Sequence, residues 1–115
     1  MKLIKACVRT RMAAQVIHAL EKLSIPCLNA SEVKVIGEEM KSEESEEVSM
    51  EYGAEFVAMT KLEILGQDSE VDRIVAAIRK SAHTGRAGDG MIVVSPVDEA
   101  MNIHSGEIEK NTGRR

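Results

Sequence analysis

The feature that most constrains this sequence is a strand-like segment followed by an amphipathic helix, which occurs twice. Residues 2–9 alternate apolar and polar side chains, as a strand with one buried face does. Between residues 13 and 23 apolar residues recur at helical spacing, with charged and polar residues on the opposite face. Residues 54–66 and 71–78 repeat this order. Two such units predict an α+β domain, because they close as one antiparallel sheet with both helices on one face.

The remaining elements complete a ferredoxin-like βαββαβ sandwich. Pro26 ends the first helix, and residues 27–37 are predicted to form the second strand. Asp68 or Ser69 is expected to cap the second helix, and residues 91–97 form the fourth strand. This arrangement leaves one sheet face without helices. Apolar side chains on that face have to be buried, which favours oligomerisation.

Length and composition limit the possible function classes. With 115 residues the chain is predicted to be a single domain, residues 1–115. A net charge of −4, the absence of tryptophan and a single tyrosine argue against nucleic-acid binding. No apolar run has membrane-spanning length, so no membrane insertion is expected. Two cysteines in strand-like surroundings favour a reducing, cytoplasmic location.

An acidic segment interrupts the periodic pattern after the second strand. Residues 38–47 contain six glutamates and one lysine. Such a composition predicts a flexible acidic loop over residues 38–55, which is either a solvated face or an element that docks on a partner protein. A second polar segment, the C-terminal tail, is predicted over residues 108–115.

The segment "HTGRAGDGM", residues 83–91, is the strongest candidate for a ligand site. A glycine-rich loop between a helix and a strand can bring backbone N–H groups close to a phosphate, or can simply turn a corner. The sequence contains no nucleophile with a base and an orienting group, so an enzyme is not predicted. Three histidines, two cysteines and seven methionines show no metal-ligand spacing, and a metal site shared between chains stays open.

With this loop in register, the chain resembles the P-II nitrogen regulatory family. Residues 84–90, "TGRAGDG", are close to the family's T-G-K-x-G-D-G, with Arg86 in the lysine position, and "SGE" at 105–107 is similar to its T-G-E. "SEVKVIG" at 31–37 and "YGAEF" at 52–56 also match, in the right order. These segments cover nearly the whole length.

The resemblance implies a homotrimeric signal-transduction protein with an adenine nucleotide (AMP, ADP or ATP) in clefts between subunits. The loop at residues 38–55 would then regulate a partner, either a transporter or a metabolic enzyme. The ligand-binding positions that the resemblance transfers to this chain are Gly37, Thr84, Gly85, Arg86, Gly88, Asp89, Gly90, Asn102 and His104.

Several charged positions of the family differ in this chain. Met91 stands in place of a lysine, and Asn102 and His104 stand in place of two arginines. Glu38 and Glu39 replace an arginine and a glutamine. The loss of cations predicts a ligand with few phosphates. Because Glu39 replaces the glutamine that in the family helps to coordinate magnesium with 2-oxoglutarate, no response to that metabolite is expected. Two alternatives are an interaction module that has lost nucleotide binding and a regulator associated with metal or inorganic-carbon transport.

The resemblance also bears on modification. Phe56 stands at the family's modified tyrosine, so no modification is expected at that position.

Overall fold

The computed structural model describes residues 1–37 and 47–109. The described elements, in chain order, are β1 (Lys2–Arg9), α1 (Thr10–Glu21), β2 (Asn29–Val35), β3 (Glu47–Ser49), β4 (Ala54–Gly66), a 3₁₀ turn (Asp68–Glu70), α2 (Val71–Ala82), β5 (Gly90–Pro96), β6 (Ala100–Met101) and β7 (Ile108–Glu109).

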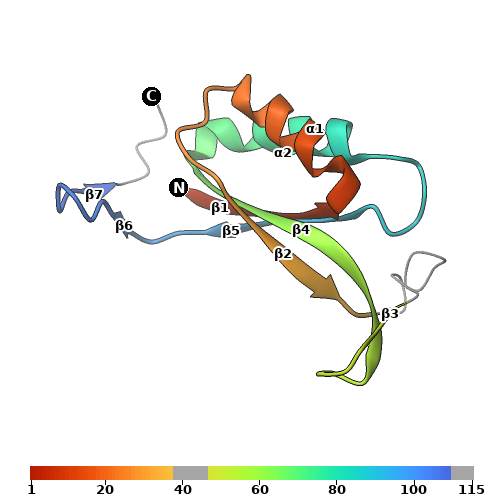
Figure 1. Ribbon diagram of the computed structural model, residues 1–115. Helices are drawn as coiled ribbons and strands as arrows, with labels where there is room; N and C mark the ends of the chain where they lie inside the picture. Colours follow the sequence, from red (N-terminus) through yellow and green to blue (C-terminus); the bar gives the residue numbers. More distant parts are fainter. Residues whose placement is uncertain (38–46, 110–115) are drawn as a thin grey trace.

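The main sheet is antiparallel throughout, with strand order β2-β4-β1-β5 and β3 added to β4. Both helices cover the same face of this sheet (Figure 1). The α+β ferredoxin-like prediction is therefore confirmed. None of the described helices is long and apolar enough to cross a membrane.

The core lies between the sheet and the two helices. Strand alternation in β1 places Ile4, Ala6 and Val8 under the helices, where all three are buried. The helices contribute an apolar stripe each, including Val16 from α1 and Ile78 from α2. Their packing against the sheet makes one continuous cluster of buried side chains.

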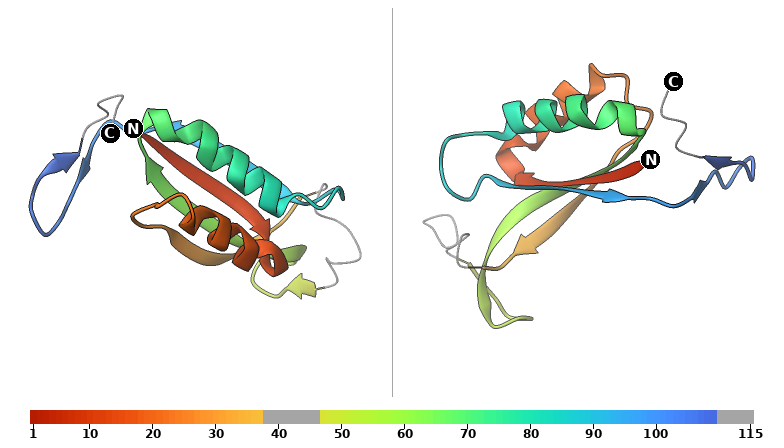
Figure 2. Two further views of the ribbon diagram at one scale, coloured as in Figure 1. Left: turned by 90° about the horizontal axis from the view of Figure 1, so that it is seen from above. Right: turned by 180° about the vertical axis from the view of Figure 1, so that it is seen from behind.

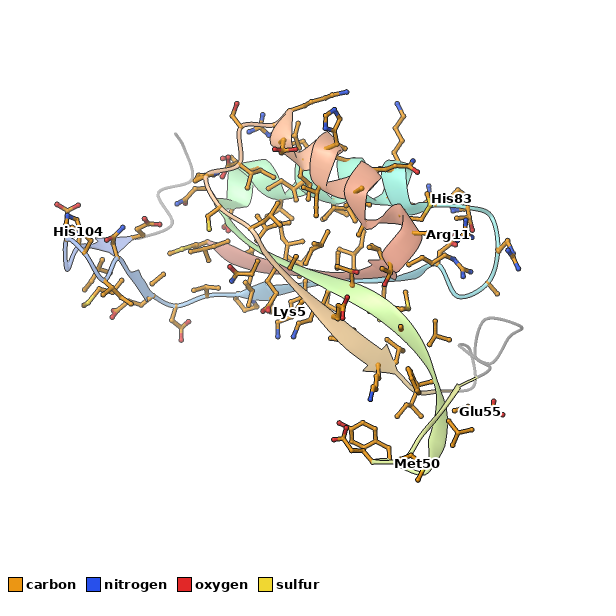
Figure 3. All side chains as sticks on the ribbon, in the orientation of Figure 1. Lys5, Arg11, Met50, Glu55, His83 and His104 are labelled. Atoms are coloured by element: carbon orange, nitrogen blue, oxygen red, sulfur yellow. The ribbon has the colours of Figure 1, made fainter. Side chains whose placement is uncertain are left out.

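The opposite sheet face carries no helix. Lys5 of β1 points away from the helices on this open face (Figure 3). Leu65 of β4 and Met91 and Val93 of β5 alternate onto the same face and are exposed. The apolar surface that the sequence predicted on an uncovered face is thus present.

The start of α2 differs from the prediction. Neither Asp68 nor Ser69 is a helix cap. A 3₁₀ turn occupies Asp68–Glu70 with Gln67 as its N-cap residue, and Glu70 is the N-cap residue of α2. The N–H of Gln67 donates to Glu70 Oε1 at 3.0 Å, and the N–H of Glu70 donates to the Gln67 carbonyl at 2.9 Å. Asp68 instead accepts a hydrogen bond from the α-amino group of Met1 at 2.8 Å. The contact with Met1 therefore occupies the Asp68 side chain, which the local sequence predicted as a helix cap.

The structure describes only part of the predicted acidic loop and the predicted tail. Of residues 38–55, residues 38–46 lie outside the described residues, and residues 47–55 form the β3–β4 hairpin, which projects from the sandwich (Figure 1). Of residues 108–115, Ile108 and Glu109 pair with β6, and residues 110–115 lie outside the described part. The β6–β7 hairpin extends from the other end of the molecule (Figure 2).

Candidate functional site

The predicted phosphate loop, residues 84–90, connects the C-terminal end of α2 to β5 (Figure 1). Gly85, Gly88 and Gly90 have φ values of 88°, 91° and 120°. These left-handed conformations turn the chain back sharply, and side chains other than glycine rarely adopt them. The glycine pattern is therefore required by the path of the loop itself.

Asp89 holds this loop closed. Its Oδ2 accepts hydrogen bonds from the N–H of Thr84 at 2.8 Å and of Gly85 at 3.3 Å, and its Oδ1 accepts one from the Thr84 hydroxyl. The N–H of Arg86 in turn donates to Thr84 Oγ1 at 3.2 Å. The first three amides of the loop are thus satisfied inside it.

Arg9, at the end of β1, anchors the closed loop to the sheet. Its Nε donates to Asp89 Oδ1 at 3.1 Å, and its Nη2 donates to the Ala87 carbonyl at 2.8 Å. Arg9 is only 6% exposed, whereas the Asp89 side chain is 20% exposed. The sequence analysis missed Arg9, because strand alternation places it on the same face as the exposed Lys5 and gives no sign that it is buried.

The electrostatics of Asp89 follow from these contacts. Burial alone would raise the pKa of Asp89, but the hydrogen bonds from Thr84, Arg9 and Gly85 outweigh burial and hold the pKa well below its ordinary value. The carboxylate is therefore charged at physiological pH. The carboxylate contacts the guanidinium of Arg9 and the loop amides. His83 Nδ1 lies 3.5 Å from its Oδ2.

Two amides of the loop stay available to a ligand. Within the described residues, the N–H groups of Ala87 and Gly88 make no hydrogen bond. They are successive donors in a turn that Arg9 and Asp89 hold rigidly. Successive backbone N–H groups in such a turn form a concavity that binds an anion. The N–H groups of Ala87 and Gly88 are thus the candidate anion donors of the loop.

A pocket of about 370 Å³ adjoins the loop, between the C-terminal end of α2 and the start of β5. Small-molecule sites have volumes in this range. Its wall is largely apolar, with Arg79, His83 and Asp89 supplying polar groups at one side. The lining residues are Cys7, Val8, Ile78, Arg79, Ala82, His83, Asp89, Gly90, Met91 and Ile92.

The thiol in this pocket is not poised for reaction or metal binding. Burial raises the pKa of Cys7, and the nearby charge of Lys61 only partly offsets that effect. The thiol is therefore protonated at neutral pH. Across residues 1–37 and 47–109, no group of three His, Cys, Asp or Glu side chains could hold a metal ion.

The other predicted site residues lie elsewhere in the chain. Asn102 and His104 belong to the turn between β6 and β7, and His104 lies at the opposite end of the molecule from His83 (Figure 3). Asn102 is occupied within its own turn, since its Oδ1 accepts from the N–H of Ser105 at 3.1 Å. Gly37 follows β2, and a Cβ there would meet no atom within 4 Å. One chain therefore brings Thr84, Gly85, Arg86, Gly88, Asp89 and Gly90 together, but not Asn102 or His104.

The sequence of this chain is similar to proteins described as nitrogen regulators. Residues 1–107 match the profile of a family described as nitrogen regulatory protein P-II. The chain is 36% identical to the nitrogen regulatory protein P-II of Azospirillum brasilense over 107 residues, which cover 93% of this chain and 95% of that protein. It is 37% identical to the nitrogen regulatory protein P-II of Microchaete diplosiphon over 112 residues, 97% of each chain. It is also 37% identical to nitrogen regulatory protein P-II 2 of Methanothermobacter thermautotrophicus over 110 residues, 96% of this chain and 95% of that protein.

Proposed function

The chain belongs to the nitrogen regulatory protein P-II family, and from this membership we propose that it senses an adenine nucleotide and regulates a partner protein in response. The ligand carries one or two phosphates, as AMP or ADP does, and binds in clefts between three identical chains. The partner is a transporter or a metabolic enzyme, and residues 38–55 contact it. A cytoplasmic location and the absence of turnover are parts of the same proposal.

The observation that carries the proposal is the brace formed by Arg9 and Asp89. Arg9 joins the end of β1 to both Asp89 and the Ala87 carbonyl, so the amides of Ala87 and Gly88 are held in place before a ligand arrives. A pre-organised anion site loses less conformational entropy on binding than a mobile loop does. A loop that only turned a corner would not need a buried guanidinium to fix it.

The charge near the loop favours few phosphates. Arg9 is committed to Asp89, and Met91 follows Gly90 where the family has a lysine. Arg86 is the cation within the loop, and Arg79 of α2 lines the adjoining pocket. Charge-assisted hydrogen bonds to a phosphate contribute about 1.5–3 kcal/mol each, so each missing cation lowers the preference for a triphosphate. The apolar pocket beside the loop suits the flat, largely apolar face of a base.

The separation of the predicted site residues supports a ring of chains. The β6–β7 hairpin, whose turn contains Asn102 and His104, lies at one end of the molecule and the 84–90 loop at the other (Figures 1 and 3). Head-to-tail contacts of this kind generate closed rings when the rotation allows it. In a cyclic trimer, the β6–β7 end of one chain then meets the loop end of the next. The exposed apolar side chains of the open sheet face are buried in the same assembly.

We expect the variant Val93→Asp to lower the trimer affinity strongly. Val93 lies on the open sheet face and is exposed in a single chain. A carboxylate buried in the interface costs several kcal/mol per chain, and the ammonium of Lys5, which lies opposite Val93 on the same face, offsets this cost only in part. Analytical ultracentrifugation should show a trimer for the parent protein and smaller species for the variant at the same concentration. Ala76→Asp is the control, because Ala76 is exposed on the outer side of α2. A monomeric parent protein, or equal effects of both variants, would contradict the assembly.

We expect AMP and ADP to bind with micromolar affinity and ATP more weakly in titration calorimetry, with and without magnesium. The variant Gly88→Val should weaken binding at least about tenfold, because a branched side chain strains a turn whose φ is 91° and adds bulk beside the two proposed donor amides. Gly53→Val is the matched control, since Gly53 also has a positive φ, of 61°, but lies in the β3–β4 hairpin. It should bind nucleotide as the parent protein does.

Other outcomes of this titration separate the alternatives. Tightest binding of ATP would show that the charge argument is wrong. A trimer that binds no nucleotide would favour an interaction module that has lost its ligand. Equal losses in Gly88→Val and Gly53→Val would remove the 84–90 loop from the site.

A further inference from the structure

The pocket beside the 84–90 loop is bordered by a small set of charged side chains. It has a volume of about 370 Å³ and lies between the C-terminal end of α2 and the start of β5. Most of its wall is apolar, and Arg79, His83 and Asp89 are the lining residues that carry a charge or can take up a proton. The charge of this set decides whether the pocket favours an anion, a cation or a neutral ligand.

This set favours an anion, because its acidic member is already paired. The carboxylate of Asp89 accepts a hydrogen bond from the buried Arg9 at 3.1 Å, and His83 Nδ1 lies 3.5 Å from its other oxygen. Arg79 is exposed, and among residues 1–37 and 47–109 its guanidinium makes no hydrogen bond or ion pair. The positive charge of Arg79 is therefore not neutralised by a neighbour, and it borders the pocket.

A purely structural role for Arg79 can be separated from a role in binding. Arg79 and Lys80 both lie in the last turn of α2, where the carbonyl end of the helix carries partial negative charge. A cation at either position stabilises the helix end. Arg79 lines the pocket, whereas Lys80 is exposed and is not among the lining residues. The same partial charge of the helix end repels an anion, so a phosphate in this pocket requires a cation such as Arg79.

We propose that Arg79 binds the phosphate of the ligand and makes the site specific for a phosphorylated nucleoside over the nucleoside itself. The inference rests on the proposed nucleotide-sensing function and adds the residue that determines this specificity. A guanidinium presents paired donors that match two oxygens of a phosphate, which a lysine does not. The base packs against the apolar wall, and the phosphate lies between Arg79 and the N–H groups of Ala87 and Gly88.

Titration calorimetry of AMP and adenosine against the full chain and its variants tests this inference. Arg79→Gln should weaken AMP binding about tenfold or more and leave adenosine binding unchanged, because only AMP has the phosphate. Arg79→Lys should restore part of the loss. Lys80→Gln removes the same charge one residue further along α2, and it should change AMP affinity less than about twofold. Equal losses for AMP and adenosine, equal losses in the two glutamine variants, or an unchanged AMP affinity in Arg79→Gln would each overturn the inference.

Inorganic pyrophosphate tests the anion contact without a base. At constant ionic strength it should raise the melting temperature of the parent protein and of Lys80→Gln, but not that of Arg79→Gln. Without ligand the two variants should melt alike, since each loses one cation from the last turn of α2. No rise in the parent protein, or an equal rise in all three proteins, would contradict the role of Arg79. If pyrophosphate stabilises the parent protein but AMP, ADP and ATP do not bind, the nucleotide-sensing proposal fails and the anion contact of Arg79 stands.

Discussion

The variant Gly90→Ala should be strongly destabilised. A Cβ at Gly90 would lie 1.8 Å from the carbonyl oxygen and 2.9 Å from the carbonyl carbon of Cys7. Both atoms belong to the backbone of β1, so no side-chain rotation relieves the clash. Gly90 also has a φ of 120°, which an alanine rarely adopts. Strain and overpacking together should cost about 4 kcal/mol, so we expect a large fall in melting temperature or loss of soluble protein.

Gly85→Ala separates the two causes. Gly85 has a φ of 88°, but its added Cβ would meet no atom within 4 Å. Only the left-handed conformation then opposes the alanine, at a cost of about 1–2 kcal/mol. Thermal unfolding followed by circular dichroism, at equal protein concentration, should give Gly90→Ala a much lower melting temperature than Gly85→Ala. Equal stability of the two variants would show that β1 and β5 do not approach as closely as described.

The fold could be predicted because its core follows local periodicity. Ile4, Ala6 and Val8 alternate in β1, and Ile74 and Ile78 repeat at helical spacing in α2. Both patterns directly reflect which face of each element is buried. The third predicted strand, residues 54–66, has the same bounds in the structure because apolar alternation runs along its length.

Elements that depend on distant partners were harder to predict. β3 lies at the end of a glutamate-rich segment with low strand propensity, and it forms because β4 offers a free edge. Asp68 has the right chemistry for a helix cap, but the α-amino group of Met1 binds it instead. In both cases a tertiary contact overrides the local preference of the sequence.

The candidate site shows the same division. The glycines of the 84–90 loop were found because their spacing is visible in a short segment. Arg9 was missed because its partner Asp89 is 80 residues away along the chain, and no local pattern connects them. The position of His104 relative to the 84–90 loop could not be predicted from the sequence either. Sequence spacing does not reveal which end of a sheet a hairpin leaves from.

The variant Asp89→Asn should lose about 3 kcal/mol of stability and the fixed shape of the 84–90 loop. The amide removes the negative charge beside Arg9, which is almost fully buried, and it accepts fewer of the hydrogen bonds from Thr84 and Gly85. Removing one partner of a buried ion pair costs about 3–5 kcal/mol, and the partial exposure of Asp89 places this site at the lower end. Urea unfolding at neutral pH measures the loss. Glu99→Gln is a control, because that residue lies on the chain after β5, outside the brace.

The same variant should change how stability depends on pH. The hydrogen bonds and Arg9 hold the pKa of Asp89 below its ordinary value of about 4, so the folded state binds this proton less readily than the unfolded state does. The stabilisation from Asp89 is therefore fully present above the ordinary pKa. It is lost as pH falls below about 5 toward the lower pKa of the folded state. The difference in unfolding free energy between parent and Asp89→Asn should be constant from pH 8 to about pH 6 and shrink steadily below about pH 5. A difference that stays constant down to about pH 3 would show that the Asp89 carboxylate is not what braces the loop.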